Sequence, residues 1–161
     1  MKKLILLLLF IPLVSFGQIT YKDLMKLDSQ DAFEKLMFDK RFSAIKEVSE
    51  GTRTYALDPD YEDKSKAFAM YFTEGTEFFY FQFVKPDELS ESFGYATNIY
   101  EEILNKVERK CKFVKMYKVA KDNYACYDCK QAEFIGLLGF TVADGMQHIS
   151  QLPYAHILDS K

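Results

Sequence analysis

The spacing of hydrophobic residues after position 17 changes from a helical to a strand-like period. Apolar side chains recur three or four positions apart over 21–27 and 31–40, which predicts two helices. Asp28 and Ser29 stand where the cap of the second helix is expected. From Phe42 the apolar positions alternate instead, with turn residues between the runs. This half is therefore predicted to continue as four strands, at 43–48, 53–57, 66–73 and 77–84.

The same order of elements follows in the second half. Helical spacing returns over 93–110, with apolar residues again three or four positions apart. Asp144-Gly145 is a strong signal for a tight β-hairpin. Four strands are predicted here as well, at 113–119, 124–126, 134–142 and 147–152.

The two halves can be laid over one another at a shift of about 70 residues. In this alignment Tyr55-Ala56 corresponds to Tyr124-Ala125, and Glu74-Gly75 corresponds to Asp144-Gly145. We therefore predict an α+β fold made of two tandem, pseudo-duplicated units. Each unit is expected to pack one helix on a four-stranded antiparallel sheet.

The predicted units cover 18–86 and 87–161 and together form one compact domain, with the helices on one face of the sheet. In layout this arrangement is similar to that of the exported β-lactamase-inhibitor proteins. Those proteins pair two helix-plus-four-strand units and bind an enzyme across the sheet. The resemblance concerns the order of elements, so no residue role is transferred from it.

The first 17 residues have the three parts of a secretory signal peptide. A pair of lysines follows Met1, 4–14 is an apolar run, and Ser15-Phe16-Gly17 is a small-x-small cleavage site. The apolar run is shorter than the roughly 20 helical residues needed to cross a bilayer, and Pro12 breaks it. We expect a mature chain from Gln18 that is secreted or periplasmic and has no membrane anchor.

The chain is mildly acidic, with 21 Lys and Arg against 24 Asp and Glu and a formal net charge of −3. Removal of the predicted signal peptide takes two lysines away and makes the mature chain more acidic. Proteins that bind nucleic acids usually carry a basic patch or stripe, whereas the basic residues here are scattered among acids between Lys22 and Lys130. A nucleic-acid partner is therefore not expected.

Three cysteines are present, Cys111, Cys126 and Cys129, and an oxidising compartment favours one disulfide and one free thiol. In an extended strand the Cα atoms of Cys126 and Cys129 would lie about 10 Å apart, beyond the roughly 7 Å that a disulfide can bridge. Pairing these two would require a turn between them. Cys111 ends the predicted helix, so we predict a disulfide from Cys111 to Cys126 or Cys129.

Candidate catalytic and metal-binding groups are few. Cys126 and Cys129 have the spacing of a redox dithiol, which requires a helix after the second cysteine, but strand-like sequence follows. The acidic run at 58–63 lacks the pattern of a helix-loop-helix calcium site and is interpreted as a solvated turn. His148 and His156 lack paired zinc-ligand spacing. We expect no metal site and no cofactor, and an enzymatic alternative would use Cys129 as nucleophile with His148 as base.

The strand predicted at 77–84 is apolar on both faces, because alternation separates Phe79, Phe81 and Phe83 from Phe78, Tyr80 and Gln82. An antiparallel sheet covered by helices on one side normally presents polar residues on the other. We expect Tyr71 of the neighbouring strand to join Phe78 and Tyr80, and we predict that these three form a binding surface. The alternative is that 58–65 or the tail from Pro153 covers this face.

The functional hypothesis that the sequence favours is a non-enzymatic module that binds a protein or another ligand on the face of Tyr71, Phe78 and Tyr80. Two alternatives are an enzyme of unrecognised type at Cys129 and His148, and a structural, envelope-associated protein. The first hypothesis requires accessible aromatic side chains. The enzymatic alternative requires Cys129 and His148 to converge within hydrogen-bond reach.

Overall fold

The computed structural model describes residues 18–45, 51–57, 67–73, 78–84 and 99–154. Several features discussed above lie outside these ranges. They are the predicted signal peptide at 1–17, the acidic run at 58–63, the covering segment proposed at 58–65, Glu74-Gly75, 46–48 and 93–98 of predicted elements, and the tail after Tyr154 with His156.

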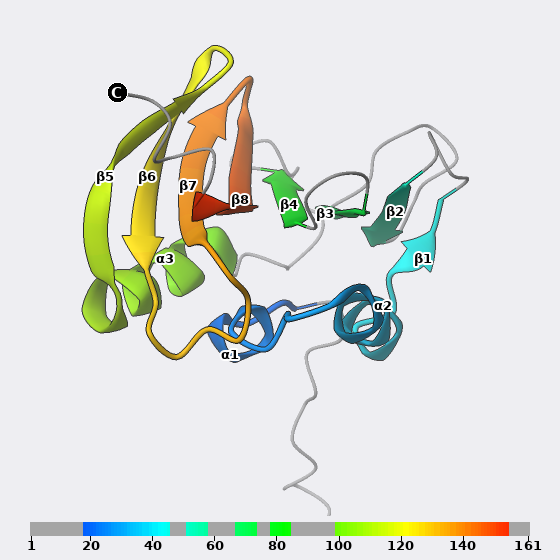
Figure 1. Cartoon of the computed structure of the whole chain (residues 1–161). Helices are drawn as coiled ribbons and strands as arrows, with labels where there is room; N and C mark the ends of the chain where they lie inside the picture. The colour runs from blue at the N-terminus through cyan, green and yellow to red at the C-terminus, as the bar shows by residue number, and fades with distance from the viewer. Residues whose placement is uncertain (1–17, 46–50, 58–66, 74–77, 85–98, 155–161) are drawn as a thin grey trace, which may run out of the picture.

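The described residues form three helices and eight strands, in the order helix, helix, four strands, helix, four strands (Figure 1). The helices are α1 (Tyr21–Leu24), α2 (Gln30–Asp39) and α3 (Ile99–Lys110). The strands are β1 (Ser43–Ala44), β2 (Thr52–Leu57), β3 (Ala67–Phe72), β4 (Phe78–Val84), β5 (Lys112–Val119), β6 (Asp122–Asp128), β7 (Leu137–Ala143) and β8 (Met146–Leu152). The α+β class predicted from the hydrophobic pattern is confirmed.

Side chains fix where the first two helices begin. Thr20 and Asp23 form a capping box at α1, in which the Asp23 carboxylate accepts from the Thr20 amide at 2.9 Å. At α2 the Ser29 hydroxyl accepts from the Ala32 amide, which confirms the predicted cap. These bonds satisfy amides that have no partner within the helix. No helix in the described ranges is long and apolar enough to cross a membrane.

All eight strands belong to one antiparallel sheet with the order β1-β2-β3-β4-β8-β7-β6-β5. The prediction of a separate four-stranded sheet in each half is therefore wrong. The last strands of the two halves, β4 and β8, pair with Phe81 opposite Ile149. This pairing satisfies backbone groups that two separate sheets would leave as exposed edges.

One large hydrophobic core lies on the sheet face that carries Phe79, Phe81 and Phe83, called the core face below. Phe81 lies opposite Ile149, and Ile149 lies opposite Phe140, so this face continues across the junction of the halves. The Phe33 ring of α2 lies 5.7 Å from the Phe81 ring, and the Tyr100 ring of α3 lies 5.6 Å from the Phe140 ring. The same cluster contains residues of α1, including Leu24. Elements of both halves thus share one core.

Two predicted strand boundaries shift, and at one of them core packing rather than strand pairing explains an apolar residue. The strand predicted from Phe134 begins at Leu137, and Phe134 lies in the preceding loop with its ring 5.3 Å from that of Phe79. Strand β6 is longer than predicted at both ends. Asp144 and Gly145 have φ values of 49° and 78°, which confirms the predicted turn between β7 and β8.

Candidate binding surface

The opposite face of the sheet, called the second face below, carries aromatic side chains at its centre. Phe78 and Tyr80 alternate with Phe79 and Phe81 along β4, so they lie on the second face as predicted. Their cross-strand partners on β3 are Phe72 and Met70.

Tyr71 does not belong to this surface, so the expectation that it joins Phe78 and Tyr80 is wrong. Tyr71 lies opposite Phe79 and is only 3% exposed. Its ring is 5.3 Å from that of Phe33 in α2, within the core. The sequence did not define the register of the β3–β4 pair, and a shift of one residue moves every side chain of a strand to the other face.

Phe72 takes the place expected for Tyr71, and the sequence prediction missed it. The Phe72 and Phe78 rings are stacked, with centroids 4.3 Å apart and planes 14° from parallel. Because all six residues of β3 are apolar, alternation of hydrophobicity gives no signal for which of them share the face of Phe78. Only the strand register distinguishes Phe72 from Tyr71.

Exposure varies across the second face. Thr54 and Ala56 on β2 are buried, and at the other side a small hydrophobic cluster is also buried. That cluster consists of Tyr124, Cys126, Leu137 and Leu152. Between these regions the side chains of β3 and β4 are partly exposed, namely Phe68, Met70, Phe72, Phe78 and Tyr80. These five residues are called the aromatic strip below.

Polar groups border the aromatic strip on the β8 side. The Tyr80 hydroxyl lies within hydrogen-bond distance of His148 Nδ1 and, at 3.2 Å, of Gln82 Oε1. His148 Nε2 lies 3.3 Å from the Ala143 carbonyl oxygen, which can only accept, so this nitrogen carries the hydrogen. The Tyr80 hydroxyl has a single hydrogen to donate, either to Gln82 Oε1 or to His148 Nδ1, so the three side chains form one polar cluster. Burial raises the pKa of the Tyr80 phenol, which keeps it a neutral donor.

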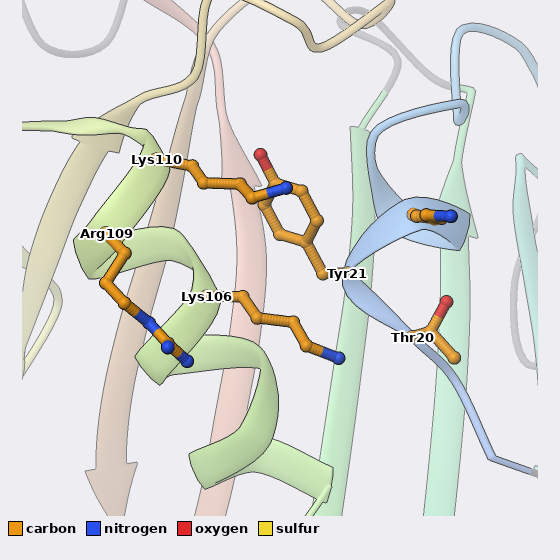
Figure 2. A pocket seen from close by; sticks show the side chains of 6 residues that line it. Thr20, Tyr21, Lys106, Arg109 and Lys110 are labelled. Atoms are coloured by element: carbon orange, nitrogen blue, oxygen red, sulfur yellow. The ribbon is translucent and has the colours of Figure 1, made fainter.

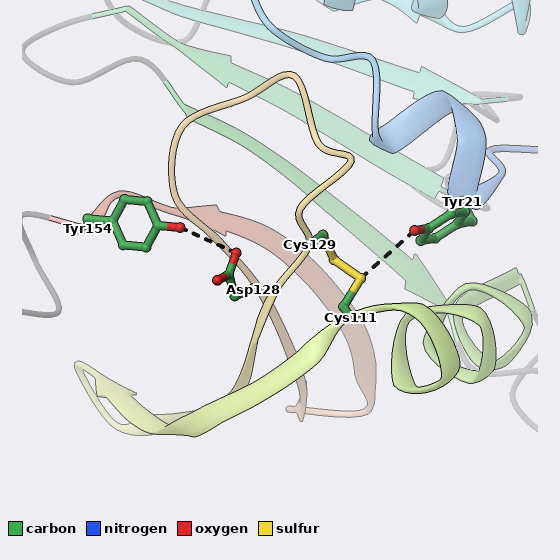
Figure 3. The surroundings of a disulfide bond; sticks show 5 residues. All are labelled: Tyr21, Cys111, Asp128, Cys129 and Tyr154. Carbon is green, nitrogen blue, oxygen red and sulfur yellow. Dashed lines mark hydrogen bonds between the residues drawn. A yellow bond between two sulfur atoms is a disulfide. The ribbon is translucent and has the colours of Figure 1, made fainter.

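A disulfide joins Cys111 at the end of α3 to Cys129 in the loop after β6 (Figure 3). The two Cα atoms are 4.5 Å apart. The predicted bridge from Cys111 is confirmed, and Cys129 is its partner.

Cys126 is a buried free thiol whose sulfur lies 3.5 Å from the Tyr124 carbonyl oxygen. Burial raises the pKa of this thiol to about 11.

The structure does not bring Cys129 and His148 together. Cys129 is bonded to Cys111 and belongs to the core, whereas His148 lies opposite Gln82 on the second face. A cysteine held in a disulfide has no thiolate to act as a nucleophile. Among the described residues, no group of three or more His, Cys, Asp or Glu side chains is arranged to hold a metal ion.

Comparison with known proteins adds no functional assignment to this geometry. No protein-family model, curated protein or solved structure matches the chain.

Proposed function

We propose that this chain is an exported, non-enzymatic binding protein that holds a protein partner against the aromatic strip of its second face. The observation that carries the proposal is the partial exposure of five neighbouring apolar side chains on β3 and β4. Phe78 and Tyr80, two of the residues predicted from sequence, belong to this strip. Large apolar side chains that stay partly exposed side by side often mark interaction sites.

The composition of the strip fits a protein partner. Aromatic residues and methionine are enriched at the centres of protein interfaces, and polar groups surround them. Phe72, Phe78 and Met70 supply the apolar centre, while Gln82 and His148 supply the polar border. Met70 adds a flexible side chain that adapts to different partner surfaces.

Two further observations support the proposal. Cys129 is bonded to Cys111 in the core and His148 lies on the second face, so the two groups of the enzymatic alternative do not converge. Export through a signal peptide at 1–17 to the medium or periplasm is part of the proposal. The disulfide supports it, because such bonds persist mainly in oxidising compartments.

We also infer that the halves 18–86 and 87–161 arose by duplication and that their helices cover the core face only. The repeated order of one helix followed by four antiparallel strands supports the first inference. The contacts of Phe33 with Phe81 and of Tyr100 with Phe140 support the second, as does the position of all three helices below the sheet in Figure 1. With the helices on the core face only, the second face stays accessible to a partner.

The proposal is tested by affinity capture from the medium and envelope fractions of the native cells. Wild type, Tyr80→Ser and Phe38→Ser are used as baits, because Phe38 on α2 is 82% exposed and lies away from the strip. We expect one partner to be retained by wild type and Phe38→Ser and to fall at least tenfold with Tyr80→Ser, while all three baits have the same circular dichroism spectrum. Equal retention by all three baits would overturn the proposal.

A further inference from the structure

A hollow with a volume of about 440 Å³ lies between α1 and the last two turns of α3 (Figure 2). The residues that line it are Thr20, Tyr21, Lys22, Lys106, Arg109 and Lys110. In Figure 2 the side chains of Lys106 and Lys110 extend from α3 toward α1. The Lys110 amine lies over the Tyr21 ring, 5.3 Å from its centroid. The volume falls within the range of sites for small molecules.

Four of the six lining residues are cations, and none of the six is a carboxylate. The nearest acids along the chain have other partners in the structure. Asp23 accepts from Thr20 and pairs with Lys40 at 2.9 Å. Glu108 lies 3.4 Å from the Tyr127 hydroxyl. In the part of the chain that the structure describes, none of the four lining cations pairs with a carboxylate.

The favourable effect of cations at a helix C-terminus accounts for only part of this cluster. Arg109 and Lys110 stand in the last turn of α3, and the Arg109 Nε donates to the Asn105 carbonyl at 2.8 Å. Lys106 lies a turn earlier, three and four positions from the other two, a spacing at which like charges repel. Lys22 comes from the four-residue helix α1, so the C-terminus of α3 does not account for its position. The end of α3 therefore does not by itself explain why four cations line one hollow.

We propose that this hollow binds a phosphate group, carried by a soluble phosphorylated molecule or by a lipid headgroup. Ammonium groups act as point charges toward phosphate oxygens, and a guanidinium adds paired donors. The Tyr21 ring gives the hollow an apolar side that suits the carbon part of such a ligand. Because the whole chain is acidic, this local cluster is needed to attract an anion. The hollow contains no residue of the aromatic strip, so the outcome of one proposal does not affect the other.

The test is an NMR titration of the purified ¹⁵N-labelled chain at constant ionic strength. The probes are inorganic phosphate, glycerol 3-phosphate, and phosphatidylcholine vesicles with and without phosphatidic acid. We expect saturable binding of at least one phosphate probe, with amide shifts or line broadening concentrated at 20–22 and 106–110. Lys106→Gln/Arg109→Gln should weaken binding at least tenfold. Lys118→Gln/Lys130→Gln, which removes the same charge at exposed sites outside the hollow, should change it less than twofold.

Each outcome decides the proposal. Saturation by glycerol 3-phosphate in free solution assigns a soluble ligand, and binding confined to phosphatidic acid vesicles assigns a lipid headgroup. Arg109→Lys keeps the charge but removes the paired donors, so it should give an intermediate affinity. Absence of saturable binding by every probe, or equal weakening in the two double variants, would overturn the proposal. Matching spectra of the variants away from the hollow provide the control for folding.

Discussion

The two faces of β4 carry aromatic side chains of similar size but differ in what packs on them. Phe79 and Phe81 are fully buried, and Phe33 of α2 contacts Phe81. Phe78 and Tyr80 on the second face are only partly buried. The comparison teaches that hydrophobic composition alone does not separate a folding surface from a binding surface. Under the proposed function, the contacts that helices make with the core face distinguish the two. The first of the three predictions below tests this difference directly.

The largest expected effect is on the core face. Phe81→Ala removes a fully buried ring and leaves a cavity, so we expect it to lower the free energy of unfolding by about 3–5 kcal/mol. The matched variant Phe78→Ala removes the same atoms from a partly exposed position, and its cost should stay below about 2 kcal/mol. Urea denaturation measures both. Equal losses would show that the second face is packed as tightly as the core.

Loss of the Cys111–Cys129 disulfide should have the next largest effect. The bond closes a loop with a sequence separation of 18 residues, and in the chain-entropy model a loop of that size contributes about 3 kcal/mol. Cys111→Ser/Cys129→Ser should lower the free energy of unfolding by this amount in oxidising buffer. A reducing agent should destabilise Cys126→Ala by as much as it destabilises wild type, since Cys126 is not bonded. A smaller response of Cys126→Ala would mean that Cys126 forms a disulfide in solution.

The smallest expected effect is a loss of stability at alkaline pH. Burial raises the pKa of Tyr100 on the core face and of Tyr80 on the second face above the usual value near 10. The folded chain then holds protons that the unfolded chain releases, so stability is full below pH 10 and falls as the pH rises above it. Tyr100→Phe should make this decline shallower in urea titrations between pH 9 and about 11.5. An unchanged slope would contradict the assignment.

The sequence predicted the element order, the turn at Asp144-Gly145 and the disulfide from Cys111 because these depend on local signals. It did not predict the single sheet, which requires β4 and β8 to pair although they are about 70 residues apart in the sequence. The choice of Cys129 over Cys126 depends on strand faces, because Cys126 points to the second face and Cys129 follows the end of β6.

The candidate sites were predictable to different extents. Phe78 and Tyr80 lie on the second face because alternation along one strand is a reliable local rule. Phe72, and not Tyr71, lies on the face of Phe78, because this assignment depends on the register between β3 and β4. The hollow combines Lys22 with Lys106, Arg109 and Lys110, which lie far apart in the sequence. Local spacing along the sequence gives no signal for this combination, because only the fold places α1 beside the end of α3.

The most direct test of the central claim is photo-crosslinking in the native cells from position 78. Phe78→p-benzoylphenylalanine places a photoreactive ring within the aromatic strip, and Phe38→p-benzoylphenylalanine places it at a more exposed site on α2. We expect one discrete crosslinked protein from position 78 that is absent from position 38. No crosslink from position 78, or the same products from both positions, would contradict the claim that the second face is the binding surface.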